Sequence, residues 1–344
     1  MPPLQPQPLE RAPGSPASRQ GRRLVVLVPC LDEAPTVASV VRGVPREIPG
    51  IQRVDVVVID DGSKDETTAC AVAAGAEVLR HSTTLGLGRT FRDGVEWALR
   101  QGADIAVTID GDGQFDPAHI PLLVKPILAG EAEMTTASRF LDRSLRPKMP
   151  LIKRLGNAWV ARIVHLLSGR RFFDVSCGFR ALSREALLRL NLFGGWTYTQ
   201  ETFLDLVFKG LRIVEIPLAV RGTREFGTSR VASNLPRYAA RSLAIMLRAF
   251  VSYRPLAFFA GVSSLFALAG FGLLAFLISH YLRTDAFSPH IWAGFVGGSL
   301  MFVSVLSLLM GILGDMLVRM RLNQEQLLYL EKRRTLDEAR RSVN

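Results

Sequence analysis

The sequence has few cysteines, and it lacks several patterns that would place it in other classes of protein. Its three cysteines, Cys30, Cys70 and Cys177, form no Cys-x-x-Cys pair, and their odd number argues against a disulfide framework. A reducing, cytosolic setting therefore fits the main domain. There is no zinc-finger spacing and no aromatic RNA-binding signature, so nucleic acid is not an expected partner. No Gly-x-Gly-x-x-Gly follows the first apolar run, which disfavours a Rossmann dehydrogenase.

Charged residues are absent from two long apolar stretches near the C-terminus. Residues 255–279 and 291–314 contain no Asp, Glu, Lys or Arg, and they are 25 and 24 residues long. Because about 20 helical residues cross the hydrocarbon core of a bilayer, these stretches predict two transmembrane helices in a hairpin at 255–316. The N-terminus has no comparable segment. Residues 1–21 are rich in Pro, Gln and Arg, lack the apolar core of a signal peptide, and predict a disordered tail.

Positive charge is in excess and flanks the apolar stretches. The net charge is +11 and the pI is about 10.2, which favours anionic lipid and phosphate as partners. The loop at 280–290 has only one Arg and one Asp, whereas arginines lie on the outer side of each stretch. The positive-inside rule thus places the main domain, both termini and a tail at 317–344 on the cytoplasmic side of a cell membrane. Residues 233–254 carry arginines on one helical face and predict an amphipathic juxtamembrane helix in the membrane interface.

Residues 22–232 alternate between strand patterns and helical patterns. The strand patterns are the β-branched and aliphatic runs at 24–29, 54–59 and 105–109. Continuous runs of this kind are typical of strands buried on both faces of a parallel sheet. The alternation predicts an α/β domain with a mostly parallel, Rossmann-like sheet and helices on both faces. Ligands of such sheets bind at the carboxyl ends of the strands.

The segment Asp110-Gly111-Asp112 follows the strand pattern at 105–109. Two carboxylates one residue apart can bind a hard divalent cation, Mg²⁺ or Mn²⁺, that also bridges the phosphates of a nucleotide diphosphate. Gln114 would add a neutral oxygen ligand. A solvated acidic turn is the alternative interpretation of this short motif.

A second acidic pair, Asp60 and Asp61, follows the strand pattern at 54–59. These carboxylates can accept hydrogen bonds from the base or from ribose hydroxyls of a nucleotide. The alternative is a helix N-cap in which Ser63 or Asp65 satisfies free backbone amides. Both interpretations remain open for different residues of the segment.

Several short motifs occur in a fixed order along the chain. They are Pro29-Cys30-Leu31-Asp32-Glu33, Asp60-Asp61-Gly62-Ser63-x-Asp65, Gly86-x-Gly88, Asp110-x-Asp112-Gly113-Gln114, Ser138-Arg139-Phe140 and Asp174-x-x-Cys177-Gly178-Phe179-Arg180. Together they resemble family 2 glycosyltransferases of GT-A fold. The resemblance is greatest to the dolichol-phosphate mannose synthase and polyprenyl-phosphate glycosyltransferase branch, including members with two added C-terminal membrane helices. It implies that residues 22–232 form a GT-A glycosyltransferase domain.

The resemblance also implies roles for individual residues. The positions that match nucleotide-sugar binding are Pro29, Leu31, Glu33, Asp60, Asp61 and Asp110. Asp110 and Asp112 match catalytic positions, and with Gln114 they match the metal and diphosphate site. Arg139 matches an arginine near the acceptor phosphate. Arg154 and Arg230 are further acceptor candidates, chosen for their charge and position.

The implied reaction is the metal-dependent, inverting transfer of a hexose from a UDP- or GDP-sugar to undecaprenyl or dolichyl phosphate at the cytoplasmic membrane face. One alternative is another membrane-bound family 2 glycosyltransferase that acts on a glycan or glycolipid. A processive polysaccharide synthase of this kind would carry Gln-x-x-Arg-Trp, which the segment 200–203 does not supply. The other alternative is a non-catalytic membrane protein that binds nucleotide-sugars. The sugar, the lipid length and the formation of a homo-oligomer are left open.

Overall fold

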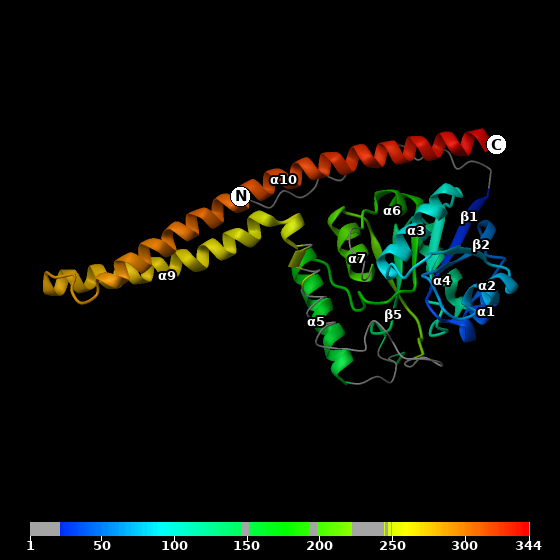
Figure 1. The fold of residues 1–344 in the computed structure, drawn as a ribbon, viewed down its shortest axis with the longest axis horizontal. Coiled ribbons are helices and arrows are strands. Elements are labelled where there is room, and N and C mark those ends of the chain that lie inside the picture. The colour runs from blue at the N-terminus through cyan, green and yellow to red at the C-terminus, as the bar shows by residue number, and fades with distance from the viewer. Residues whose placement is uncertain are drawn as a thin grey trace. The chain divides into compact units, whose positions relative to one another are not determined.

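The computed structural model describes residues 21–142, 144–145, 151–192, 198–221, 244, 247–248 and 250–343 (Figure 1). The chain divides into two compact units. One contains residues 1–246 together with 329–344, and the other contains residues 247–328. The predicted tail lies outside the described residues except for Gly21, and so does most of the predicted juxtamembrane helix at 233–254.

A seven-stranded sheet forms the centre of the first unit (Figure 1). Its strands are β1 (Arg22–Cys30), β2 (Ile51–Asp60), β3 (Glu77–Arg80), β4 (Ile105–Thr108), β5 (Met134–Ser138), β6 (Arg180–Ser183) and β7 (Ile213–Pro217). The strand order is β3-β2-β1-β4-β6-β5-β7, and only β6 runs antiparallel to its neighbours. The prediction of a mostly parallel α/β sheet is confirmed.

Helices connect the strands and supply the apolar residues that cover the sheet. They are α1 (Ala34–Gly43), α2 (Thr67–Ala73), α3 (Leu87–Arg100), the short 3₁₀ helix η1 (Pro117–His119), α4 (Ile120–Leu128), α5 (Leu151–Ser168), α6 (Arg184–Arg189) and α7 (Thr199–Phe208). Residues 24–28 of β1 are completely or almost completely buried at the centre of the core. Burying one Val or Leu side chain stabilises a fold by about 1.5–3 kcal/mol, so the run that predicted β1 also anchors the domain.

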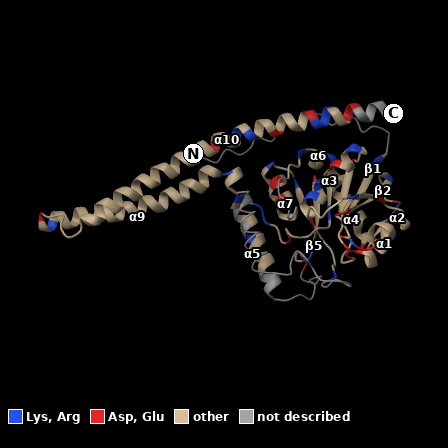
Figure 2. Ribbon diagram, in the orientation of Figure 1, with Lys and Arg blue, Asp and Glu red and all other residues tan. Residues whose placement is uncertain are grey.

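The second unit contains α9 (Pro255–Thr284) and the first part of α10 (Ile291–Val343). Both helices are long and apolar enough to cross a membrane. Figure 2 shows that charged residues are absent along most of α9 and the first part of α10, and present along the rest of α10. The two predicted spans therefore lie within these helices. Helix α10 continues to Val343, where the sequence predicted only a tail.

Small residues allow α9 and α10 to approach each other closely. A Cβ on Gly270 would lie 2.8 Å from the carbonyl oxygen of Gly297, so a larger side chain does not fit there. The hydroxyls of Ser263 and Ser304 lie 2.9 Å apart in a buried hydrogen bond between the helices. Small residues and hydroxyl pairs of this kind are typical of helix packing in membranes.

Candidate active site

The described site residues that follow β1, β2, β4 and β5 lie at one edge of the sheet, because these strands run in the same direction. In the β1–β2 ladder Cys30 pairs with Asp60, and in the β1–β4 ladder Leu27 pairs with Thr108. The segments after β1 and β2 therefore begin side by side at Leu31 and Asp61, and the segment after β4 begins three residues earlier, at Ile109, and runs toward the same edge. Strands β5 and β7 end at the same edge, and the antiparallel β6 begins there.

Hydrogen bonds join the segment after β1 to the segment after β2. The backbone amide of Asp32 donates to Ser63 Oγ at 2.9 Å, and the amide of Lys64 donates to Asp32 Oδ1 at 2.7 Å. The amide of Glu33 donates to Thr67 Oγ1 at 2.8 Å. Asp32 adopts a left-handed conformation with φ 51°, which Asp tolerates better than most residues. These bonds hold the predicted nucleotide-binding segments against each other.

Asp60 is fully buried at the end of β2 and accepts hydrogen bonds from its own loop. Its Oδ1 accepts from the Ser63 amide at 2.8 Å, and its Oδ2 accepts from the Thr68 hydroxyl. Burial alone would raise the pKa of Asp60, but the hydrogen bonds from Ser63 and Thr68 and the charge of Arg80 lower it. The carboxylate is therefore held ionised. It holds the Ser63 loop but caps no helix. The N-cap of α2 is Glu66, which makes no side-chain cap bond, and of the two expected capping residues Asp65 accepts the Thr67 amide at 3.1 Å.

Asp61 is also buried, and its carboxylate organises the turn before α3. Oδ1 accepts the Leu85 amide and Oδ2 accepts the Gly86 amide, each at 2.8 Å, and His81 Nδ1 lies 2.8 Å from Oδ1. Gly86 has φ 94°, a conformation that favours glycine, so the turn depends on both residues. A direct contact of Asp61 with a nucleotide stays a prediction.

The Asp110–Asp112 segment packs tightly against the end of β1. A Cβ on Gly111 would lie 2.4 Å from Cys30 Sγ, which no residue larger than glycine allows without a shift. The hydroxyl of Thr36 donates to the Gly111 carbonyl at 2.7 Å. Asp112 is buried, and its Oδ1 accepts the Gln114 amide at 3.0 Å. The tight turn places both carboxylates directly beyond the sheet edge.

The pKa of the buried Cys30 thiol is affected by acidic residues near the end of β1. Burial raises the pKa of this thiol well above its usual range, and the charges of four carboxylates raise it further. They belong to Glu33, Asp60, Asp110 and Asp112. The strand ladder and the Gly111 contact agree with this, because Cys30 pairs with Asp60 and a Cβ on Gly111 would lie 2.4 Å from Cys30 Sγ.

The donor set at this edge fits a hard divalent cation that keeps part of its coordination for substrate. Among the described residues, no group of three or more His, Cys, Asp or Glu side chains is arranged to hold a metal by itself. Asp110 and Asp112 supply two carboxylates, and the Gln114 side chain, whose Nε2 donates to the Arg221 carbonyl at 3.4 Å, is the third predicted ligand. Mg²⁺ and its relatives commonly bind through one or two carboxylates plus substrate phosphates and water. The chain would thus supply the carboxylate ligands of such a site, and substrate phosphates and water would supply the rest.

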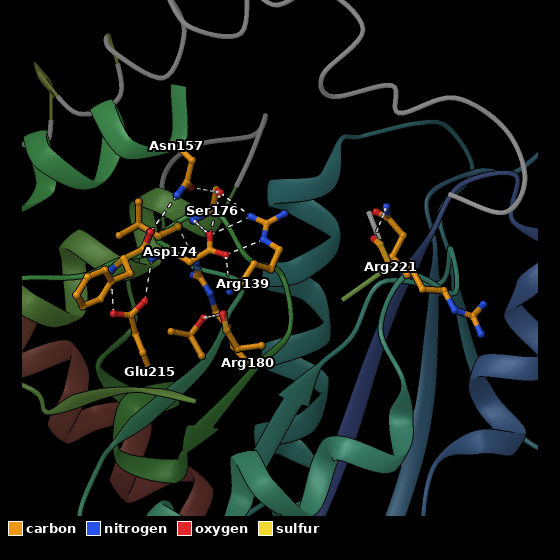
Figure 3. A network of polar contacts seen from close by, with 12 residues as sticks. Arg139, Asn157, Asp174, Ser176, Arg180, Glu215 and Arg221 are labelled. Atoms are coloured by element: carbon orange, nitrogen blue, oxygen red, sulfur yellow. Dashed lines mark hydrogen bonds and ion pairs between the residues drawn. The ribbon is translucent and has the colours of Figure 1, made fainter. Parts of the chain in front are cut away.

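Arg139 lies at the end of β5 in a network with Asp174 (Figure 3). Its Nε and Nη2 donate to the two carboxylate oxygens of Asp174 at 2.6 and 2.9 Å, and Nη2 also donates to Ser176 Oγ at 3.0 Å. Asp174 is fully buried, and Arg139 is 21% exposed. A bidentate arginine–carboxylate pair fixes the plane of the guanidinium.

The Arg139 network extends to α5 and β7. Glu215 accepts the amides of Phe173 and Asp174 at 2.9 and 2.8 Å. Asn157 of α5 donates to the Phe173 carbonyl at 2.9 Å and accepts the Ser176 hydroxyl at 2.8 Å. The loop that holds Arg139 is thus fixed from both sides. For the other acceptor candidates, the side chain of Arg154 and all of Arg230 lie outside the described residues.

The fold and the sequence agree with those of a known enzyme family. Residues 25–190 match the profile of glycosyl transferase family 2. An uncharacterized protein of Methanocaldococcus jannaschii is 33% identical over 210 residues, which are 60% of this chain and 84% of that relative. This chain belongs to glycosyl transferase family 2.

Two other comparisons concern proteins with named activities. The polyprenol monophosphomannose synthase of Mycolicibacterium smegmatis is 27% identical over 231 residues, which are 64% of this chain and 85% of the relative. A crystal structure of glucosyl-3-phosphoglycerate synthase from Mycobacterium tuberculosis, in complex with Mn²⁺, UDP and glucosyl-3-phosphoglycerate, is 25% identical with a TM-score of 0.51. The similarity covers 67% of this chain and 80% of that chain. GT-A-like neighbours of this family 2 domain were crystallised with Mn²⁺ and UDP, which supports a divalent cation.

The family 2 domain also contains site residues whose roles sequence reasoning did not resolve. A Cβ on Gly178 would lie 2.9 Å from Asp110 Oδ2, so the Asp110 carboxylate rests against the Gly178 backbone. The Gly178 carbonyl accepts hydrogen bonds from Thr108 Oγ1 at 2.7 Å and Tyr198 Oη at 3.3 Å. The motif before β6 contained Gly178, but nothing in the sequence indicated that it borders Asp110.

Arg180 is a fully buried cation behind the same edge. Its Nη1 donates to the Thr199 carbonyl at 2.6 Å and its Nη2 to the Val175 carbonyl at 2.9 Å. Burial lowers the pKa of Arg180, whereas the charges of nearby groups, including Asp174 and Asp110, raise it. A buried guanidinium needs hydrogen bonds and opposite charge to stay ionised, and this family 2 site supplies both.

Proposed function

We propose that this family 2 glycosyltransferase moves a hexose from a nucleoside diphosphate sugar to a polyprenyl phosphate, with a divalent cation and with inversion at the anomeric carbon. One observation carries the proposal. The ends of β1, β2 and β4 bring Asp60 and the Asp110–Asp112 turn against Cys30, at an edge that also carries the oriented guanidinium of Arg139. An acidic cluster suits a cation and a donor diphosphate, and a fixed guanidinium suits an acceptor phosphate.

The chemistry requires positioning more than proton transfer. A phosphate monoester is largely anionic at neutral pH, so its oxygen needs no strong base to attack the anomeric carbon. A bond forms from that oxygen to the carbon, the bond to the donor diphosphate breaks, and the nucleoside diphosphate leaves. A cation held by Asp110 and Asp112 would neutralise charge on the leaving diphosphate. Arg139 would orient the acceptor phosphate through its planar fork of donors.

Two features of the chain favour a lipid-linked acceptor. Helices α9 and α10 are long and apolar enough to cross a membrane. The relative from Mycolicibacterium smegmatis, which this chain matches over 85% of the relative's length, is named a polyprenol monophosphomannose synthase. We place the catalytic domain and both termini on the cytoplasmic side of the cell membrane, because the arginines flank the hairpin there.

Purified membranes that contain the protein provide the test. They are incubated with labelled UDP- and GDP-sugars and polyprenyl phosphate, with and without a chelator, and lipid-linked label is extracted and counted. We expect labelled lipid from at least one donor and none after chelation. A full panel of donors that gives no labelled lipid would sink the proposal.

A matched pair of variants tests the metal assignment. Asp112→Asn keeps the oxygen that accepts the Gln114 amide but removes the charge, so transfer should fall by about 100-fold or more. Asp116→Asn is the control, because Asp116 is exposed and caps η1 by accepting the Ala118 amide at 2.9 Å. Normal transfer by Asp112→Asn would refute the metal role. Equal losses in both variants would point to folding instead.

A further inference from the structure

The last part of α10 docks on the outer face of α6 within the first unit. Tyr329 is only 7% exposed, and its hydroxyl donates to Glu185 Oε2 at 3.0 Å. The guanidinium of Arg189 lies over the Tyr329 ring, 4.8 Å from its centroid. A tyrosine with a covered ring and a satisfied hydroxyl is a typical interface anchor. Tyr329 therefore fixes this end of α10 to α6.

Two more contacts extend the docked face along α10. Asp337 forms an ion pair with Arg184 at 3.2 Å, and Lys332 Nζ donates to Asn191 Oδ1 at 3.4 Å. Burial, followed by the charge of Lys209, lowers the pKa of Lys332, as expected for an ammonium enclosed by the contact. Lys332 and Asp337 follow Tyr329 by three and eight residues, spacings that place each of them on the same side of the helix as Tyr329. Tyr329, Lys332 and Asp337 thus form one continuous face, which we call the docking face.

The rest of this helix segment behaves as an ordinary solvent-exposed surface. Arg334 and Glu338 form an ion pair at 2.8 Å, and their side chains are 82% and 62% exposed. Such exposed pairs contribute little to stability. The burial of Tyr329 is therefore specific to the docking face and is not a general property of the segment.

The helix that carries the docking face also carries a candidate membrane span. Helix α10 is continuous from Ile291 to Val343, and its apolar part ends near Gly314. Its partner α6 follows β6 directly, and β6 begins at Arg180, two residues after Gly178. The first part of α10 is thus a candidate membrane span, and its last part contacts α6, which follows a strand that begins beside the candidate active site.

We propose that the docking face is an internal tether that holds the C-terminal end of α10, the helix with a candidate membrane span, on the catalytic domain. It deepens the proposed function and rests on it, because the tether matters only for an acceptor that is held in the bilayer. A flexible connection would let the domain sample many orientations, most of which cannot receive a membrane-bound phosphate. Attachment of α10 at α6 would restrict the number of these orientations before the acceptor binds.

The test compares two acceptors in the full-length protein. Tyr329→Ala removes the side chain that fixes α10 to α6, and it leaves both apolar helices intact. We expect transfer to long-chain polyprenyl phosphate in vesicles to fall about tenfold or more, because the tether's positioning is lost. Transfer to a short, water-soluble isoprenyl phosphate should stay within about twofold of the unmodified rate. Glu338→Ala is the matched control on the exposed side and should alter neither rate.

Hydrogen exchange of residues 329–343 reports docking independently of activity. Protection of these amides should drop in Tyr329→Ala and persist in Glu338→Ala. The tether is refuted if Tyr329→Ala undocks the helix but leaves both transfer rates unchanged, or lowers both equally. It is also refuted if the unmodified segment shows no protection. By contrast, failure of the unmodified protein to use any polyprenyl phosphate would refute the proposed function, whatever the exchange data show.

Discussion

Replacement of Gly178 by alanine should damage the active site through one added methyl group. The new Cβ would lie 2.9 and 3.0 Å from the two carboxylate oxygens of Asp110, whereas ordinary contact begins at 3.4 Å. The carboxylate, or the loop, must therefore move by about 0.5 Å. A misplacement of 1 Å in a catalytic site can cost about 100-fold in rate, so we expect about a tenfold loss of kcat/KM.

The Gly178→Ala effect should appear in metal dependence as well as in rate. Because the displaced group is a predicted cation ligand, the divalent cation concentration for half-maximal transfer should rise. Overpacking a buried site typically destabilises a fold by about 1–3 kcal/mol, so thermal unfolding is measured in parallel. Gly156→Ala is the control, because its Cβ would meet nothing within 4 Å. Unchanged transfer and unchanged metal dependence in Gly178→Ala would refute the placement of Asp110.

Two further predictions concern the acids around the site. Asp174→Asn removes the charge that fixes Arg139, so the KM for polyprenyl phosphate should rise about tenfold while donor affinity, measured by nucleotide titration, stays unchanged. The lowered pKa of Asp60 means that its contribution to stability is present above the unfolded value of about 3.9 and is lost as pH falls through the folded value. Asp60→Asn should therefore lower stability at neutral pH and flatten its acid dependence, which denaturant titrations from pH 3 to pH 7 would show. An unaltered acid profile would contradict this reasoning.

The sequence predicted those strands that consist of a continuous run of aliphatic residues. Strands β1, β2 and β4 are runs of buried aliphatic residues, and each ends in the residues that now line the sheet edge. The antiparallel β6 was not predicted, because Arg180-Ala-Leu-Ser is short and begins with a charge. Its arginine is buried only because carbonyls from Val175 and Thr199 surround it, which no local pattern shows.

The sequence predicted which residues belong to the site. It did not predict their contacts, which involve residues far apart in the sequence. The motif order placed Asp110, Asp112 and Arg139 together, and the strand ladders now explain why they share an edge. Asp61 was expected at a nucleotide, but its carboxylate accepts two backbone amides from a turn more than 20 residues away. The docked end of α10 was interpreted as a tail, because a charged segment without a span has no local signal for the surface that it covers.

The pairing of Arg139 with Asp174 shows how the site could handle two anionic substrates. Paired with a carboxylate, the arginine contributes little net charge, so its attraction for phosphate depends on geometry more than on long-range field. The side chain has already lost its rotamer freedom to Asp174 and Ser176, and a ligand need not supply that entropy again. Glu215 in turn holds the Asp174 backbone. Under the proposed function, selectivity for a phosphate head group thus depends on a guanidinium that is oriented before the ligand binds. A substitution at Asp174 or Glu215 should therefore weaken acceptor binding more than donor binding.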